Sequence, residues 1–212
     1  MLQTAVKTLV GSTSLLLVSA VLAEPYVGLE LGIGKFDTKG SSSDSTLNDM
    51  AQKTADSLDT KVSLRLVGGQ YIKDNIRLYL YAQQDGELEV SESSSLYKLT
   101  HTYESYELGF GSDYIYNFNN QFSGFLGASL GHYRSELGAR IEDSEGYDSE
   151  TSKKSGLVTG FNLGLGYNVT KNFALQGGWR WSHYAGNKHK IDPITYKLES
   201  SNELYFGAGY NF

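Results

Sequence analysis

Two unlike kinds of residue alternate along most of the chain after residue 24, and this alternation constrains the fold more than any other feature. The segment 27–34 carries Val, Leu or Ile at its odd positions and Gly or Glu30 at its even positions. Successive side chains of a β-strand point to opposite faces of the sheet, so the segment predicts a strand with one apolar face and one polar, small-residue face. The same design recurs along the rest of the chain. The eight predicted strands contain residues 27–34, 62–66, 76–81, 106–111, 126–131, 161–166, 175–181 and 203–212.

The connections between these segments differ in length and composition. The short ones are rich in Asn, and the long ones are rich in Ser, Asp and Glu. Short connections span residues 73–75, 117–121 and 168–172, and long ones span residues 37–60, 83–97, 134–155 and 184–197. An even number of alternating strands with short turns at one end and long loops at the other is typical of outer-membrane barrels. We therefore predict an all-β fold, an eight-stranded antiparallel up-and-down transmembrane β-barrel with short periplasmic turns and long extracellular loops.

Two other fold classes fit the sequence less well. A bundle of membrane helices is excluded, because the mean hydropathy of the chain is −0.34. A soluble lipocalin-like barrel also has eight strands, but its large apolar side chains point inward. Such a barrel would leave Leu, Val and Phe outside or place Glu30 and Arg65 in an apolar core, so the membrane barrel is favoured.

The N-terminus carries the one long apolar stretch of the chain, preceded by Lys7. Val21 and Ala23 provide the small residues that signal peptidase requires before its cleavage site. We therefore predict a cleavable signal peptide over residues 1–23 and a mature barrel over residues 24–212, located in the outer membrane of a Gram-negative cell. A buried N-terminal helix is the alternative.

Six charged residues fall on the polar face of the predicted strands, three acidic and three basic. They are Glu30, Arg65, Arg77, Glu107, Arg180 and Glu203. Charges that are buried must be paired to be tolerated, and an eight-stranded barrel has an interior just wide enough for its own side chains. We predict that these residues form a balanced charge network inside the barrel, which plugs the lumen.

The long loops carry the net negative charge of the mature chain, with 16 acidic and 9 basic residues. Two acidic clusters in the loops have the carboxylate oxygens that calcium or magnesium prefers. They are Asp85, Glu87, Glu89 and Glu92, and Glu142, Asp143, Glu145 and Asp148. Neither cluster has EF-hand spacing, so we expect solvated loops, no metal and no cofactor. The same acidity argues against nucleic acid as a partner.

The segment 181–187 is superficially similar to the His and Ser pair of the lipid A deacylases. Ala185 stands where that pattern has its Ser nucleophile, and Ser182 and His183 would point to opposite faces of a strand. Nucleophilic catalysis needs a hydroxyl, a base and an orienting acid together. We therefore expect no catalytic residue.

The C-terminal residues 205–212 carry the most specific family likeness. Their aromatic and glycine residues end in Phe212 and resemble the terminal signal by which the barrel-assembly machinery recognises its clients. Residues 164–168 are similar to a strand end of the same family. The chain resembles the small eight-stranded outer-membrane barrels, such as the OmpA transmembrane domain and OmpX, and more narrowly the AcfA-type accessory colonisation factors. The resemblance implies that Gly207, Tyr210 and Phe212 belong to the assembly signal.

Membrane physics explains the strands, so function is left to the loops. We predict a non-catalytic outer-membrane barrel whose acidic extracellular loops serve adhesion, colonisation or an envelope-structural role. The expected partners are outer-membrane lipids, lipopolysaccharide, the barrel-assembly machinery and a host or cell-surface ligand. The alternative is a narrow porin-like channel for small solutes, and a lipid A-modifying enzyme is less favoured.

Overall fold

The computed structural model describes residues 24–42, 47–57, 59–72, 75–93, 97–143 and 146–212. The predicted signal peptide, residues 1–23, lies outside the described residues. The described part of the chain contains nine strands and one helix. They are β1 (Glu24–Ser42), α2 (Asn48–Ser57), β2 (Thr60–Ile72), β3 (Ile76–Ser93), β4 (Tyr97–Asn117), β5 (Phe122–Asp143), β6 (Tyr147–Asn168), β7 (Phe173–Tyr184), β8 (Lys188–Ile191) and β9 (Ile194–Asn211).

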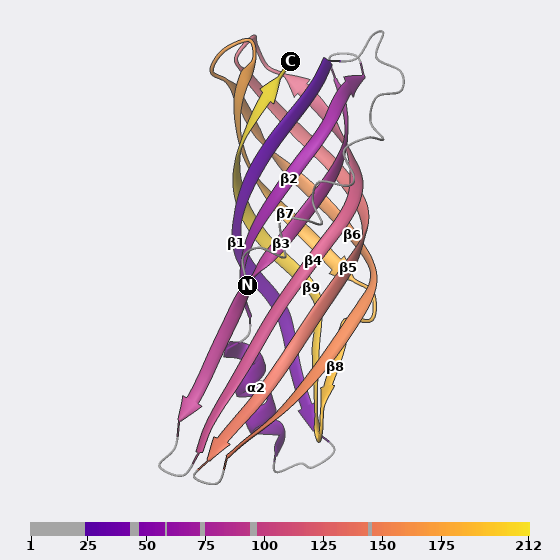
Figure 1. The fold of residues 1–212 in the computed structure, drawn as a ribbon. Coiled ribbons are helices and arrows are strands. Elements are labelled where there is room, and N and C mark those ends of the chain that lie inside the picture. Colours follow the sequence, from indigo (N-terminus) through magenta and orange to yellow (C-terminus); the bar gives the residue numbers. More distant parts are fainter. Residues whose placement is uncertain (1–23, 43–46, 58, 73–74, 94–96, 144–145) are drawn as a thin grey trace, which may run out of the picture.

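Eight of the strands close into a barrel (Figure 1). Each strand from β1 to β6 pairs antiparallel with the next, β7 pairs with β9, and β9 pairs with β1. Strand β8 pairs with β9 beyond the end of β7, so β7 and β8 share one place in the ring. The predicted eight-stranded antiparallel barrel is therefore confirmed.

The outer face of the barrel is apolar, because the register brings like residues side by side. Leu31 of β1 pairs with Leu64 of β2 and with Phe206 of β9, and all three side chains are exposed. The two faces differ sharply along one strand: Leu108 is 67% exposed, and its neighbour Glu107 is 4% exposed. Large exposed apolar side chains recur on this face of the strands, as the alternation predicts. Lipid covers such a band in a membrane, so it marks the membrane-spanning part.

The tight turns lie at one end of the barrel. They join β4 to β5 at residues 118–121 and β6 to β7 at residues 169–172, as predicted. In the first turn, Asn119 Oδ1 accepts hydrogen bonds of 2.8 Å from two backbone N–H groups, those of Gln121 and Phe122. An Asn side chain that binds its own backbone in this way stabilises a turn. Short turns lie on the periplasmic side of such barrels.

The long connections differ from the prediction, because they consist largely of strands rather than irregular loops. Strand β5 runs to Asp143 and β6 begins at Tyr147, so most of the segment 134–155 is a hairpin. The period-two alternation continues through it with reversed polarity: Leu137 is fully buried inside, and Arg134 is exposed outside. A polar outer face gives this hairpin the composition of a loop.

The other long connections behave in the same way. Strand β1 continues to Ser42 and is followed by α2, β3 and β4 are separated by residues 94–96, and β8 with the start of β9 fills most of 184–197. We call the part of the barrel beyond the apolar band the cap; it forms the lower part of Figure 1. The cap comprises residues 36–42, 48–57, 85–93, 97–105, 133–143, 147–158, 184–191 and 194–201.

The cap has a hydrophobic core of its own. Its members are Phe36, Ala55, Tyr103, Tyr133, Leu137, Ala139, Val158, Tyr184, Ile191, Tyr196 and Leu198. Aromatic rings meet across it: Phe36 and Tyr103 have ring centroids 5.3 Å apart, and Tyr133 and Tyr184 lie edge to face at 5.4 Å. The cap is therefore packed in the manner of a soluble domain, with apolar residues inside and polar residues outside.

Helix α2 covers one side of the cap and packs against β1. Thr38 Oγ1 donates a 2.8 Å hydrogen bond to the carbonyl oxygen of Ala55. Gly40 permits the close approach, because a Cβ there would lie 2.0 Å from the carbonyl oxygen of Ala51. Among the described residues, no helix is long and apolar enough to cross a membrane.

Candidate functional site

The lumen is filled by the side chains that the alternation places inward. All six predicted interior residues are buried, and each comes from a different strand. They are Glu30 of β1, Arg65 of β2, Arg77 of β3, Glu107 of β4, Arg180 of β7 and Glu203 of β9. The structure brings five of them into one network and places Arg77 closer to the tight turns.

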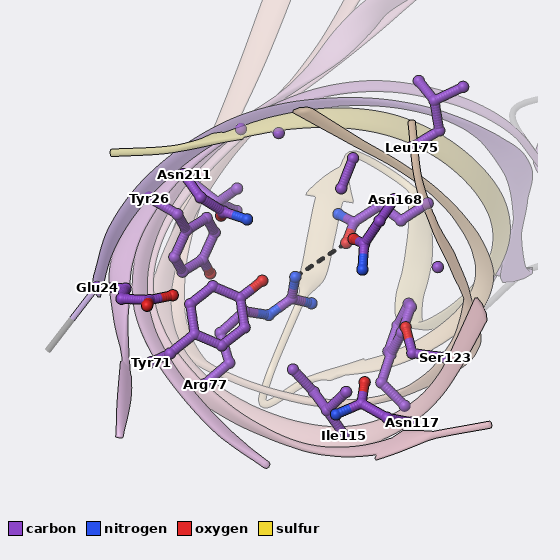
Figure 2. A pocket seen from close by; sticks show the side chains of 17 residues that line it. Glu24, Tyr26, Tyr71, Arg77, Ile115, Asn117, Ser123, Asn168, Leu175 and Asn211 are labelled. Atoms are coloured by element: carbon purple, nitrogen blue, oxygen red, sulfur yellow. Dashed lines mark hydrogen bonds between the residues drawn. The ribbon is translucent and has the colours of Figure 1, made fainter. Parts of the chain in front are cut away.

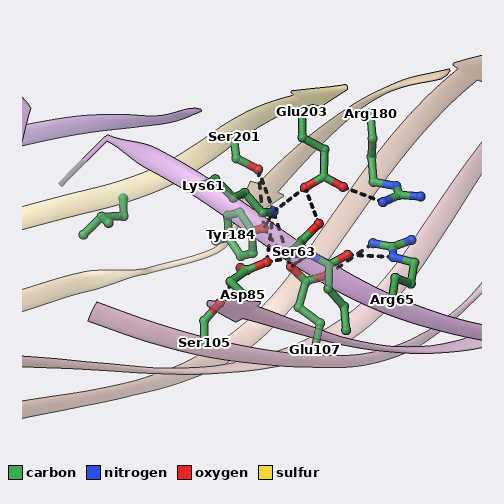
Figure 3. A network of polar contacts seen from close by, with 12 residues as sticks. Lys61, Ser63, Arg65, Asp85, Ser105, Glu107, Arg180, Tyr184, Ser201 and Glu203 are labelled. Atoms are coloured by element: carbon green, nitrogen blue, oxygen red, sulfur yellow. Dashed lines mark hydrogen bonds and ion pairs between the residues drawn. The ribbon is translucent and has the colours of Figure 1, made fainter. Parts of the chain in front are cut away.

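Arg180 joins two of the predicted glutamates. Its guanidinium forms ion pairs with Glu30 and, at 2.5 Å, with Glu203. Arg65 lies 3.7 Å from Glu107 and donates a 2.6 Å hydrogen bond to Gln83. The two arginines thus contact side chains from other strands, which ties distant parts of the ring together across the lumen (Figure 3).

Lys61 lies at the centre of this network, and the sequence analysis missed it. Its side chain is fully buried, with Nζ 3.2 Å from Glu203 and 3.6 Å from Asp85. The ammonium group also donates a 2.8 Å hydrogen bond to the hydroxyl of Tyr184. Lys61 shares its parity with Arg65 in β2, so the alternation itself contained the signal.

Asp85 corrects the prediction of a solvated acidic loop at this position. Its side chain faces the lumen, is buried, and accepts hydrogen bonds from Ser105 Oγ at 2.6 Å and Gln83 Nε2 at 2.7 Å. The strand β3 continues past the predicted segment 76–81, so Asp85 keeps the inward parity of Arg77 and Gln83. The side chains of the other cluster members Glu87, Glu89, Glu92, Asp143 and Glu145 lie outside the described residues.

Arg77 pairs with Asp113, which the sequence analysis also missed. Its Nε and Nη2 donate to Asp113 Oδ2 at 2.9 and 2.5 Å. Gln176 connects this pair to the main network, because it accepts from Arg77 at 3.0 Å and donates to Glu30 at 2.7 Å. Asp113 follows Glu107 at the same parity along β4, so it belongs to the inward face.

The interior charges are more numerous than predicted and are not balanced. Among the described residues, five carboxylates and four cationic groups are buried in the lumen. They are Glu30, Asp85, Glu107, Asp113 and Glu203, with Lys61, Arg65, Arg77 and Arg180. One oxygen, Glu107 Oε2, has no hydrogen-bond partner within the part of the chain that the structure describes, and it lies 3.7 Å from the guanidinium of Arg65.

A smaller polar cluster lies within the cap, beyond the charge network. Asn187 donates to Tyr103 at 3.1 Å and to the carbonyl oxygen of Leu198 at 3.0 Å. Ser135 Oγ lies 2.7 Å from Asn187 Oδ1 and 3.0 Å from His189 Nε2. The other ring nitrogen of His189 lies 3.0 Å from the carbonyl oxygen of Ser152. These contacts connect β4, β5, β6, β8 and β9.

The pair of Ser135 and His189 has the spacing of a nucleophile and its base, and the sequence analysis missed it. Both side chains are buried, at 1% and 0% exposed, so no substrate reaches the hydroxyl. The group that orients His189 is a backbone carbonyl and not a carboxylate. Burial lowers the pKa of His189 to about 4, which the nearby Lys154 reinforces. The pair is therefore a packing contact of the cap.

Ser182 and His183, from the segment that is superficially similar to the lipid A deacylase pair, lie on opposite faces of β7, as expected from the alternation. Ser182 is buried inside the barrel. His183 is exposed and stacks on Trp181, with ring centroids 6.2 Å apart and an interplanar angle of 13°. The two side chains cannot act together.

A cavity of about 290 Å³ occupies the end of the lumen with the tight turns (Figure 2). The side chains of Tyr71, Asn117 and Asn168 point into it, and Arg77 reaches across its inner end. The ion pair of Arg77 with Asp113 separates this cavity from the charge network. Along the barrel axis, the lumen therefore consists of an open cavity, a charged plug and the apolar core of the cap.

The residues that resemble an assembly signal lie near the C-terminal end of β9. Tyr210 and Phe212 are exposed on the lipid face, with ring centroids 5.1 Å apart. The backbone N–H of Phe212 donates a 3.0 Å hydrogen bond to the carbonyl oxygen of Pro25, next to the start of β1. Gly207 faces the lumen, where a Cβ would lie 2.9 Å from the carbonyl oxygen of Leu29.

Comparison with known proteins agrees with this architecture. A family model described as the outer membrane protein beta-barrel domain matches residues 9–212. The fold is similar to that of Neisserial surface protein A, with a TM-score of 0.56 and 21% identity over 89% of this chain and 97% of that one. It is also similar to a major outer membrane protein of Thermus thermophilus, with a TM-score of 0.53 and 11% identity over 89% and 99% of the two chains. No curated protein matches the sequence.

Proposed function

Because the chain belongs to the outer membrane protein beta-barrel family, we propose that it is a non-catalytic surface protein whose cap binds a ligand outside the cell. The barrel lies in the outer membrane and contacts its lipids through the apolar band. The observation that carries the proposal is the packed, strand-built cap, with its polar outer surface. Ordered hairpins hold side chains at fixed spacing, which lowers the entropic cost of binding a partner.

The tip of the hairpin formed by β5 and β6 is the part of the cap that best fits a binding surface. Tyr147 is 69% exposed there, and the guanidinium of Arg140 lies 4.4 Å from the centroid of its ring. Tyr and Arg are enriched among the residues that dominate binding energies at interfaces. Glu142 pairs with this guanidinium at 2.6 Å, so the ring and the guanidinium suit a ligand with apolar and hydrogen-bonding groups, such as lipopolysaccharide, a matrix protein or a cell surface.

Transport and catalysis are less well supported. Two layers of ion pairs and the apolar core of the cap block the lumen, which disfavours a porin-like channel. The described Ser and His pairs are either buried or split between the two faces of a strand, which disfavours a lipid A-modifying enzyme. The narrower resemblance to the AcfA-type colonisation factors stays a prediction.

The binding proposal is tested with the full barrel folded in lipid vesicles. We expect it to bind at least one of three probes: lipopolysaccharide, extracellular-matrix proteins or whole cells. The double variant Arg140→Ala, Tyr147→Ala should weaken that binding by roughly tenfold or more. The control, Lys190→Ala with Asp192→Ala, removes an exposed ion pair on the hairpin of β8 and β9 and should leave binding unchanged. Absence of binding to all probes, or equal binding by both variants, would contradict the proposal.

Residues 1–23 are proposed to be removed during export, which leaves the barrel of residues 24–212. The small residues before position 24 support this cleavage site. Mass spectrometry of the protein purified from outer membranes should find an N-terminus at Glu24. Retention of the apolar segment in the mature protein would contradict this assignment.

A further inference from the structure

We propose that the cavity at the periplasmic end of the barrel is a binding site for a neutral, hydroxyl-rich ligand of the size of one sugar unit. The site is distinct from the cap and does not depend on the cap having a ligand. Its volume of about 290 Å³ lies just below the range for sites of drug-sized molecules, which is ~300–1,000 Å³, as a smaller ligand requires.

The chemistry of the lining favours a neutral ligand. Arg77 is the one cationic residue among those lining the cavity, and its charge is already neutralised by Asp113 at 2.5 Å. Glu24 is the one acidic residue of the lining, and it lies at the start of β1. A charged ligand would therefore find no buried group of opposite charge that is free to pair with it.

The polar groups of the lining match hydroxyls. Four amide side chains line the cavity, and each carries both a donor and an acceptor, as a hydroxyl group does. They are Asn117, Asn168, Gln176 and Asn211. Gln176 is held in place between Arg77 and Glu30, so its amide is oriented before a ligand arrives. Preorganised polar groups of this kind give a site its specificity.

Aromatic and apolar side chains complete the site. Tyr71 and Phe125 line the wall together with Ile115, and Tyr71 packs against Tyr26 with ring centroids 5.3 Å apart. Figure 2 shows Tyr71 and Asn168 on opposite sides of the cavity, with the guanidinium of Arg77 between them. A sugar ring has apolar C–H faces and polar edges, and this arrangement offers a surface for each.

Two glycines provide a matched pair of variants. A Cβ at Gly209, which lines the cavity, meets only the carbonyl oxygen of Val27 within 4 Å, at 3.5 Å. Gly209→Leu therefore fills the cavity without removing a hydrogen bond. A Cβ at Gly68 meets nothing within 4 Å. Gly68 has the parity opposite to Val67, which lines the cavity, so Gly68→Leu adds the same side chain on the outer face.

The test is an NMR titration of the full barrel in lipid nanodiscs, which follows the side-chain amide signals of Asn and Gln. D-Glucose and N-acetyl-D-glucosamine are the probes, and inorganic phosphate and ethylammonium are the charged controls. We expect a saturable shift with either sugar at millimolar concentration and none with the charged controls. Gly209→Leu should weaken sugar binding by roughly tenfold or more, and Gly68→Leu should leave it unchanged.

Three results would overturn the proposal. They are the absence of a saturable shift with both sugars up to roughly 100 mM, saturable binding of a charged control at the same amides, and equal sugar affinity in Gly209→Leu and the unmodified barrel. Heat-modifiability on gels shows that each variant is folded before it is titrated.

Discussion

The hydroxyl of Tyr184 donates a 2.7 Å hydrogen bond to Glu107 Oε1, while its ring packs in the apolar core of the cap. One side chain thus belongs to both the charged plug and the cap. The same hydroxyl accepts from Lys61 at 2.8 Å. The two layers are therefore joined by a residue at the end of β7, and they should resist unfolding together.

Removal of this hydroxyl should destabilise the barrel while preserving the ring packing. Tyr184→Phe removes one hydrogen-bond partner from each of the buried groups Glu107 and Lys61. The free energy of unfolding should therefore fall by about 1–3 kcal/mol. Urea titration of the barrel in lipid vesicles, followed by tryptophan fluorescence, measures the change. Tyr147→Phe removes a hydroxyl from an exposed ring and should change stability by less than about 0.5 kcal/mol. Equal effects of the two variants would contradict the coupling.

A charge introduced on the outer surface should reduce stability in the apolar band but not in the cap. Leu108 is exposed at mid-strand, so Leu108→Arg places a charge in hydrocarbon and should cost about 2–4 kcal/mol near the midplane. Ser149 is exposed on the hairpin of β5 and β6, and Ser149→Arg should cost little. Folding yields into liposomes compare the two variants. Equal tolerance would contradict the lipid-facing assignment of Leu108.

Acid should weaken the cap through His189. Burial lowers the pKa of His189 to about 4, below its ordinary value of 6.5. The folded protein therefore binds its proton less readily than the unfolded chain, so the contribution of this group is present above pH 6.5 and is lost as the pH falls toward 4. Between pH 7 and pH 4.5 the loss should be about 2 kcal/mol.

The variant His189→Gln isolates this effect from other titrating groups. Urea titrations at both pH values should show a larger fall in the free energy of unfolding for the unmodified barrel than for the variant. A fall of the same size in both proteins would show that His189 is not the group responsible.

Phe212 should act in biogenesis. It is exposed on the lipid face and its backbone joins β9 to Pro25 at the seam of the ring. Deletion of Phe212 should lower the amount of folded, heat-modifiable barrel in the outer membrane far more than it lowers synthesis. Deletion of one residue between β3 and β4 should do neither. Normal levels of folded protein without Phe212 would remove the support for its proposed role in recognition by the barrel-assembly machinery.

The membrane-spanning part was predictable, because its signal is local. Each apolar residue such as Leu31 or Leu108 alternates with a small or polar one, and this alternation identifies both the strand and its lipid face without knowledge of the neighbours. The inward position of Glu30 and Arg180 follows from the same pattern. Their pairing does not, because it depends on the register and tilt of strands that are far apart in sequence.

The cap could not be predicted from composition. Its hairpins keep the period of a strand, but they place Tyr133 and Leu137 inside and Arg134 and Glu136 outside. This reversal of polarity occurs where the solvent outside the strand changes from lipid to water. A search for apolar residues on the outer face therefore ends at the membrane boundary, and Asp85, which lies just past it on the inward face, was assigned to a loop.

The conductance of the unmodified barrel in planar lipid bilayers tests the closed lumen most directly. Arg180 lies between Glu30 and Glu203, Arg77 pairs with Asp113, and the apolar core of the cap lies beyond them. These layers leave no continuous water path, so we expect little or no steady current across a range of voltages and salt concentrations. A reproducible, large open state of the unmodified protein would contradict the plugged lumen and would favour the channel over the surface-binding barrel.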